Sequence, residues 1–200
     1  MLSLDLLLAS TSSYRRELLS RLGIPFRARA PLVDEESLKR PEWSPQEMAE
    51  RLAFAKADSL VLEERGATII GSDQLVEFDG RILGKPGTAE AAIDQLCSLS
   101  GRVHRLITAV VVLHGSQAFR HTDITTLHMR PLPRPELEQY VQADRPLDCA
   151  GSYKLEQRGI TLFERIDSAD HSAITGLPLI ALTTILRDIG FRPVAGSTAS

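Results

Sequence analysis

The stretch that decides the fold is "LLLASTSSYRREL", residues 6–18, near the start of the chain. Its leucines belong to a short apolar run over Leu4–Ala9, which is typical of a strand buried on both faces. A cluster of small hydroxyl residues follows, and the leucines of Tyr14–Leu22 then recur with a helical period that Gly23 ends. Residues 24–33 alternate and predict a second strand, so the order strand–helix–strand indicates an α/β fold.

The rest of the chain continues to alternate between predicted helices and strands. A capping box of Ser44 and Glu47, with Pro45 at the first helical position, predicts a helix that is expected to run to Arg65. The other predicted elements are a strand over 67–78 with a hairpin turn at Asp79-Gly80 and a return at 81–84, a helix from Thr88 to Leu99, a long hairpin over 104–113 and 118–132, a helix over Pro135–Ala143, loops and a short strand over 149–166, and a helix from Leu177. We therefore expect one α/β domain over residues 1–192, with an elongated mixed sheet flanked by helices, two lobes and a central cleft, and a loose tail over 193–200.

The composition is that of an ordinary globular protein. Of the 200 residues, 43% are hydrophobic and 24% are charged, which is enough apolar material for a real core. The formal net charge of −3 gives no general attraction to nucleic acids or anionic membranes, so neither is expected as a partner. Cys97 and Cys149 stand far apart without a Cys-x-x-Cys pattern, which predicts reduced thiols rather than a disulfide framework. No secretory or membrane-spanning pattern is visible, and a cytoplasmic location is expected.

Two arginines stand where a helix normally favours acidic side chains. Arg15 and Arg16 fall in the first turn of the first predicted helix, where the helix dipole is positive. Backbone N–H groups at a strand-to-helix turn bind phosphate well, and an arginine fork pairs with phosphate oxygens. The two arginines therefore indicate a local anion site, with solvated surface arginines as the alternative.

Acidic and basic residues further along the chain point to the same chemistry. The segment "VDEES", residues 33–37, holds Glu35 among three carboxylates, which suits either a metal ion near a phosphate or a charged surface loop. Lys56 shares a helix face with Leu52 and Leu60, so its ammonium either reaches solvent past the apolar face or has an anionic partner.

Asp73 and Lys85 belong to the richest segment of the sequence. Asp73 follows an apolar strand and a Gly-Ser pair, a setting in which a carboxylate is costly unless it is paired or coordinated. Lys85 follows on the return arm of the same predicted hairpin. This is not a Walker A loop, because the glycine spacing fails and no helix follows. A hairpin that brings the two side chains together would suit a metal-bound phosphate, and structural roles for both stay open.

In this order, several motifs resemble the Maf family of nucleotide pyrophosphatases. They are "LLASTSSYRRELL", "VDEE", "GSDQ", "LGKP" and "CAGSYKLEQRGITLFERIDSADHSAITGLPL", and the resemblance extends from Leu6 to Ile189. It implies an α/β fold similar to the inosine-triphosphate pyrophosphatases. It also implies hydrolysis of nucleoside triphosphates to the monophosphate and pyrophosphate, with a divalent cation, Mg²⁺ or Mn²⁺, as cofactor.

The resemblance also implies roles for individual residues. Asp73 matches the family's catalytic carboxylate, read as a proton acceptor, and Glu35 and Asp73 are the expected metal ligands. The residues that match the polar lining of the phosphate and metal site are Ser10, Arg15, Glu35, Lys56 and Lys85.

Three positions of the family pattern distinguish its substrates. One branch acts on dTTP and UTP and tends to carry Arg, Thr and Gln there, whereas the 7-methyl-GTP branch carries an aromatic residue, Gln and Glu. This chain has Tyr14, Gln74 and Glu156, with Tyr in place of the usual Trp. Tyr14 suits stacking on the cationic ring of 7-methylguanine, and Glu156 suits a bidentate contact with guanine N1–H and its 2-amino group. We therefore expect a 7-methyl-GTP pyrophosphatase, with a dTTP/UTP pyrophosphatase as the alternative.

A different class of function is suggested by the family's association with septum formation. Under this interpretation the protein is a nucleotide-binding regulator of cell division that turns its nucleotide over negligibly. Asp73 and Lys85 favour an enzyme, because a protein that only binds nucleotides need not keep a carboxylate beside a polyphosphate. The expected partner is a nucleoside triphosphate substrate, and whether the chain forms a homodimer stays open.

Overall fold

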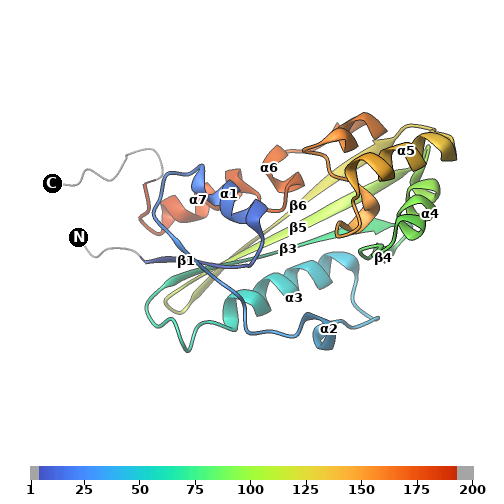
Figure 1. Cartoon of the computed structure of the whole chain (residues 1–200). Helices are drawn as coiled ribbons and strands as arrows, with labels where there is room; N and C mark the ends of the chain where they lie inside the picture. The colour runs from blue at the N-terminus through green and yellow to red at the C-terminus, as the bar shows by residue number, and fades with distance from the viewer. Residues whose placement is uncertain (1–4, 193–200) are drawn as a thin grey trace. The chain divides into compact units, whose positions relative to one another are not determined.

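The computed structural model describes residues 5–192 and confirms the expected α/β class (Figure 1). The elements in chain order are β1 (Leu6–Ala9), α1 (Ser13–Ser20), β2 (Arg27–Arg29), α2 (Glu35–Leu38), α3 (Pro45–Asp58), β3 (Thr68–Phe78), β4 (Arg81–Leu83), α4 (Ala89–Leu99), β5 (Val103–His114), β6 (Gln117–Met129), α5 (Arg134–Asp144), two 3₁₀ helices η1 (Ala150–Ser152) and η2 (Arg158–Leu162), β7 (Phe163–Asp167), α6 (His171–Ile174) and α7 (Leu179–Asp188). The predicted loose tail over 193–200 and the predicted strand start at Leu4 lie outside the described residues.

The strands form one mixed sheet. Its order in the described residues is β2-β1-β3-β5-β6-β7, and β4 pairs with β3 beside this path. β1 runs parallel to both β2 and β3, whereas β3–β4 and β6–β7 are antiparallel. The parallel start follows from the helical crossovers α1 and α3, and the antiparallel pair β3–β4 follows from the tight Asp79-Gly80 turn that the sequence predicts.

The chain divides into two compact units. The first unit contains the described residues 5–74, 108–123 and 170–192, and the second contains 75–107 and 124–169. β3, β5 and β6 pass from one unit into the other. The single domain and the central cleft expected from the sequence stay predictions.

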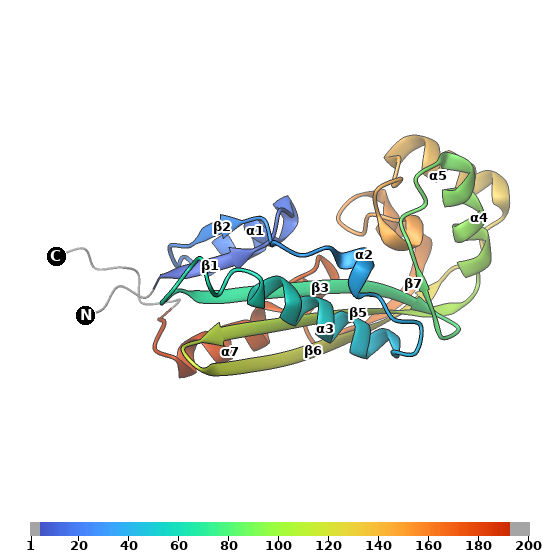
Figure 2. The same cartoon turned by 90° about the horizontal axis from the view of Figure 1, so that it is seen from below.

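Within the first unit, helices cover both faces of the sheet (Figures 1 and 2). Side chains alternate along β1, so Leu7 and Ala9 pack on the α3 side with Ala57, while Leu6 and Leu8 pack on the side of α1 and α7. All four β1 residues are buried. The apolar run at the start of the chain is therefore a strand buried on both faces, as predicted.

Gly71 lets α3 lie directly on β3. A Cβ atom at this position would lie 2.2 Å from the Ala53 carbonyl oxygen and 2.8 Å from the Ala57 nitrogen, both of them backbone atoms of α3. Any side chain here would push the helix away from the strand. The glycine of "GSDQ" thus fixes the separation of the two elements that carry Lys56 and Asp73.

The helix α3 begins as predicted and ends earlier than predicted. Both hydrogen bonds of the Ser44–Glu47 capping box are present, with Pro45 in the first turn. The helix ends at Asp58 rather than at Arg65, and the chain goes on in tighter turns, in which Leu60 N–H and Val61 N–H each donate to the carbonyl three residues earlier. The apolar period of the sequence extends past Asp58 because Leu60 is also buried, although it lies beyond the end of α3.

Other local differences from the sequence prediction have simple causes. The second strand covers only Arg27–Arg29 rather than residues 24–33, because Pro25 and Pro31 flank it and cannot donate to a sheet ladder. Two helices of four residues each, α2 and α6, were not predicted, since they are too short to show a period. The helix starts near residues 134 and 179 differ from the prediction by one or two residues.

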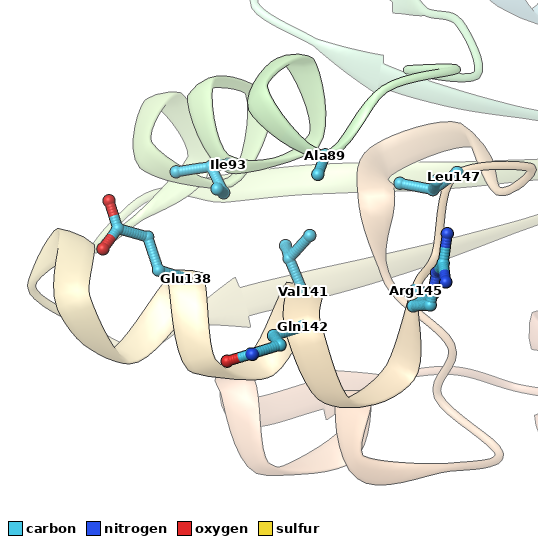
Figure 3. A pocket seen from close by; sticks show the side chains of 7 residues that line it. All are labelled: Ala89, Ile93, Glu138, Val141, Gln142, Arg145 and Leu147. Atoms are coloured by element: carbon cyan, nitrogen blue, oxygen red, sulfur yellow. The ribbon is translucent and has the colours of Figure 1, made fainter.

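The second unit is built around α4 and α5, which pack against each other. Arg134 of α5 pairs with Glu90 and Asp94 of α4. Figure 3 shows the hollow between the two helices, where the side chains of Ile93, Val141 and their neighbours converge. None of the seven residues that line this hollow in the described chain is a predicted site residue.

Both cysteines, and all the helices tested for membrane spanning, lie within the residues that the structure describes. Cys97 and Cys149 are both free thiols, as predicted. Within residues 5–192, no helix has both the length and the hydropathy that a membrane crossing requires.

Candidate functional site

A buried lysine and two carboxylates form the charged centre of the first unit. Lys56 Nζ lies 2.5 Å from Asp73 Oδ1 and 3.1 Å from Glu35 Oε2. Lys56 and Asp73 are each only 5% exposed, whereas the Glu35 side chain is partly exposed. The structure therefore brings together three predicted site residues from separate parts of the sequence. Lys56 has an anionic partner and does not reach past the apolar face to solvent.

Local structure explains why these side chains meet. Asp73 lies on the same side of β3 as Ile69 and Gly71, because side chains alternate along a strand, and this side is covered by α3. Lys56 is in the last turn of α3 and is carried to Asp73 by the close approach that Gly71 permits. Glu35 opens α2 immediately after that helix's N-cap residue.

Asp73 keeps one carboxylate oxygen that the protein does not use. Oδ1 accepts a hydrogen bond from Lys56, but Oδ2 is buried and has no hydrogen-bond partner among the described residues. Burial raises the pKa of Asp73 above its ordinary value, and the positive charges of Lys56 and Arg15 oppose that rise. A carboxylate with a raised pKa and an unpaired acceptor oxygen can take a proton from a bound water or coordinate a cation.

Arg15 belongs to the same centre and is held by a backbone carbonyl. Its Nε–H donates to the Gly176 oxygen at 2.9 Å, and its backbone N–H donates to the N-cap Ser12 at 3.3 Å. Burial lowers the pKa of the guanidinium, while Asp73 and Glu35 act in the opposite direction, and the group keeps its charge. The arginine that looks unfavourable at a helix start is thus stabilised by tertiary contacts. Arg16 beside it is exposed.

Ser10 and Tyr14 flank the turn that joins β1 to α1. Ser10 is buried, and its Oγ accepts a hydrogen bond from Ser12 N–H at 3.1 Å. Tyr14 is 38% exposed in the first turn of the helix. This turn has the strand-to-helix form that phosphate sites use. The phosphate-binding role of Ser10 and the base-stacking role of Tyr14 stay predictions.

Gln74 lies on the face of β3 opposite Asp73. Its Nε2 is 2.8 Å from the Ala173 oxygen, 3.0 Å from the Ile174 oxygen and 3.0 Å from Thr108 Oγ1. The amide nitrogen is therefore committed to acceptors within the protein, and only the amide oxygen is left to contact a ligand. The predicted influence of Gln74 on substrate choice is not tested by this geometry.

Two polar residues of the same face were missed by the sequence analysis. Ser72 and Thr108 are almost completely buried. Thr108 donates to the Ala173 oxygen in α6, and Ser72 Oγ lies 2.9 Å from the oxygens of both Gly176 and Ala109. Their signal in the sequence is weak, since each is a single hydroxyl residue inside a long apolar strand. Ser72 could have been noticed because it directly precedes Asp73.

Lys85 and Glu156 are both exposed residues of the second unit. Lys85 follows β4, and Glu156 lies in the turn between the two 3₁₀ helices. The backbone before Glu156 is held firmly, because Ser152 Oγ donates to Gln95 and Lys154 N–H donates to the Tyr140 hydroxyl. The phosphate role of Lys85 and the base-reading role of Glu156 stay predictions.

The charged centre suits a divalent cation only in part. Among the described residues, no group of three or more His, Cys, Asp or Glu side chains could hold a metal ion. Asp73 and Glu35 nevertheless approach the same ammonium, and Asp73 Oδ2 is an unpaired carboxylate oxygen. Mg²⁺ commonly takes one or two protein carboxylates and completes its shell with substrate phosphates and water. The two carboxylates therefore fit a cation that arrives with its phosphate ligand.

The architecture is shared with a solved structure of low sequence similarity. The structure of the Staphylococcus aureus Ham1 protein matches with a TM-score of 0.53 at 13% identity, covering 92% of this chain and 99% of that one. At this identity the match supports the fold alone. It agrees with the fold class expected from the sequence.

Sequence comparison then identifies the family. The Maf-like protein model matches residues 5–189, and the chain belongs to this family. A relative from Bdellovibrio bacteriovorus is 54% identical over 184 residues, which cover 92% of this chain and 96% of the relative. Another from Xanthomonas campestris pv. campestris is 48% identical over 188 residues, with 93% and 96% covered. Both relatives are named 7-methyl-GTP pyrophosphatase.

Proposed function

We propose that this protein hydrolyses nucleoside triphosphates to the monophosphate and pyrophosphate, with 7-methyl-GTP as its preferred substrate. The observation that carries the proposal is Asp73, a buried carboxylate with one oxygen on Lys56 and the other unpaired among the described residues. Membership of the Maf-like family and the names of relatives at 48–54% identity support the substrate.

Asp73 is the proposed proton acceptor of the reaction. A water molecule attacks the α-phosphorus, its oxygen forms the new P–O bond, and its proton passes to Asp73. The bond between the α-phosphorus and the bridging oxygen breaks, and pyrophosphate leaves with the bonding electrons. The raised pKa of Asp73 supports this role, because a base works best when its pKa lies closer to the working pH.

Lys56 and Arg15 supply positive charge at the same place. Lys56 holds Asp73 Oδ1, which fixes the carboxylate and leaves the other oxygen to act. The Arg15 side chain donates one N–H to the Gly176 oxygen, and its other four N–H groups are the proposed donors to phosphate oxygens. Catalysis of phosphoryl transfer depends mainly on positioning the substrate and on fixed positive charges that stabilise the polyphosphate in the transition state.

Asp73 and Glu35 would hold the divalent cation, Mg²⁺ or Mn²⁺. When bound, the cation neutralises negative charge on the phosphate oxygens. The fit rests on two carboxylates that share Lys56 and on the unpaired Asp73 Oδ2.

A substrate panel tests the proposed function. With Mg²⁺ and with Mn²⁺, the purified protein should release pyrophosphate from 7-methyl-GTP faster than from GTP, UTP or dTTP, as measured by kcat/KM. A preference for UTP or dTTP would support the alternative branch and contradict the proposed substrate. Nucleotide binding without pyrophosphate release would contradict the enzymatic function itself.

Replacing Glu156 with glutamine tests how the base is selected. A carboxylate accepts two charge-assisted hydrogen bonds from guanine, whereas an amide offers one acceptor and one donor, so Glu156→Gln should lower kcat/KM for 7-methyl-GTP by about 10- to 100-fold. The rate for UTP should change little. Glu164→Gln serves as a control, because Glu164 is another exposed glutamate of the second unit. Equal losses for 7-methyl-GTP and UTP would assign Glu156 no part in base selection.

A further inference from the structure

The end of α6 is held by polar side chains that rise from the sheet. α6 has only four residues, so its last carbonyls have no partner within the helix. Thr108 Oγ–H donates to the Ala173 oxygen at 3.0 Å, and Gln74 Nε2 donates to the oxygens of Ala173 and Ile174. The Ala173 oxygen also accepts from Gly176 N–H at 2.9 Å, so side chains of β3 and β5 add to a turn that the backbone itself closes.

The other end of the same segment is fixed by Asp170. This buried carboxylate accepts from Ser172 N–H at 2.9 Å, from Ser172 Oγ–H at 2.5 Å and from Ile180 N–H at 2.7 Å. Asp170 therefore caps α6 and the start of α7 at once. Residues 170–180, hereafter the α6 segment, are thus joined to β3 and β5 through the carbonyls of Ala173 and Ile174, and Gly176 lies beyond these two points.

The Gly176 carbonyl joins this segment to Arg15. Its oxygen accepts from Arg15 Nε–H at 2.9 Å and also lies 2.9 Å from Ser72 Oγ. A Cβ atom on Gly176 would lie 3.5 Å from Arg15 Nε, so the arginine side chain lies directly against the segment. Ser72 Oγ lies at the same distance from the Ala109 oxygen of β5, so its one proton is shared between two carbonyls and the hydroxyl links β5 to the Gly176 carbonyl. Ser72 is fully buried and cannot itself reach a ligand in solvent.

We propose that Ser72 is a positioning residue, which orients Arg15 toward the triphosphate by fixing the Gly176 carbonyl. The inference rests on the proposed function and adds a residue to it. Arg15 is electrostatically coupled to Asp73, so a small change in its guanidinium position changes the charge that surrounds the reacting phosphates. Displacements of about 1 Å in such groups cost up to about 100-fold in rate.

A double-mutant cycle tests the role of Ser72. Ser72→Ala should lower kcat/KM for 7-methyl-GTP by about 10-fold in the wild-type background. In the Arg15→Ala background, Ser72→Ala should lower kcat/KM less than about twofold, because the guanidinium through which Ser72 acts is then gone. The same fold-loss in both backgrounds would show that Ser72 acts independently of Arg15 and would overturn the inference.

Thr68→Val is the matched control. Thr68 is another buried hydroxyl residue of β3, and its Oγ1 contacts His114 Nδ1 at 2.8 Å rather than the α6 segment. The control should lower the unfolding free energy to a similar extent as Ser72→Ala while leaving kcat/KM within about twofold of wild type. A tenfold loss in the control would mean that any buried hydroxyl of this strand has the same effect, and the inference would fail.

If the wild-type protein hydrolyses none of the four nucleotides, the proposed function fails. The cycle is then measured on the dissociation constant of inorganic pyrophosphate by calorimetry with the same four proteins. Coupling between Ser72 and Arg15 in binding supports the positioning role, and additive or absent effects overturn it.

Discussion

Replacing Asp73 with asparagine should lower kcat for 7-methyl-GTP by about 10²–10⁴-fold, the range that the loss of a general base costs. Asparagine has nearly the same shape and keeps an acceptor oxygen for Lys56, but it cannot take a proton from water at neutral pH. The unpaired Oδ2 of Asp73, buried in the described structure, is the atom whose loss matters. Steady-state pyrophosphate release measures the effect, and turnover within about tenfold of wild type would contradict the role of Asp73.

Glu77→Gln is the matched control for this change. Glu77 is another buried carboxylate of β3, and it accepts from Arg105 Nε–H and from Gly80 N–H, each at 2.6 Å. Its neutralisation should lower the unfolding free energy without a hundredfold loss of turnover. If both variants lose activity to the same extent, the loss reflects damage to the strand rather than the missing base.

The dependence of kcat/KM on pH distinguishes a role of Asp73 as proton acceptor from a role as a negative charge alone. Burial raises the pKa of Asp73, so its carboxyl takes up a proton at a higher pH than an ordinary aspartate does. Because only the ionised carboxylate accepts a proton, kcat/KM should fall as the pH decreases through that raised pKa. In Asp73→Asn the residual activity should lack this acidic decline.

The charged centre was largely predictable because each of its members breaks a local rule. Asp73 follows apolar residues of a strand, and Lys56 lies on an apolar helix face. A charged group buried in either place needs an oppositely charged partner. The structure supplies each with the other. Glu35 was recognised as part of an acidic cluster, although the short helix that presents it has too few residues to show a period.

The α6 segment escaped prediction for the opposite reason. Ser72, Gln74 and Thr108 contact backbone carbonyls of the α6 segment that are 65 to 104 residues away in the chain, and no spacing in the sequence records such contacts. The early end of α3 was missed similarly. Leu60 continues the apolar period and is buried, but it lies in a tight turn closed by bonds to the carbonyls three residues earlier, which the same apolar period does not distinguish from a helix.

The second large effect concerns the stability of the fold. Lys56→Met keeps the length of the side chain and removes its charge, which leaves the Asp73 carboxylate buried without a cation at 2.5 Å. Removal of one partner of a buried ion pair costs about 3–5 kcal/mol, since the remaining charge is unsatisfied. Urea unfolding should therefore show Lys56→Met to be less stable by this amount. Lys39→Met is the control, because Lys39 forms an exposed pair with Glu36, and it should cost less than about 1 kcal/mol.

Combining Lys56→Met with Asp73→Asn distinguishes a pair kept for stability from one kept for function. The second change removes the unsatisfied charge, so the double variant should recover part of the lost unfolding free energy, with a coupling of about 0.5–3 kcal/mol. It should still be inactive, because both the proton acceptor and its fixing cation are gone. Buried ion pairs seldom stabilise a fold more than apolar residues of the same volume do, so stability alone does not account for Lys56 and Asp73. If Lys56→Met is no less stable than Lys39→Met, the Lys56 ammonium and the Asp73 carboxylate do not form a buried ion pair in solution.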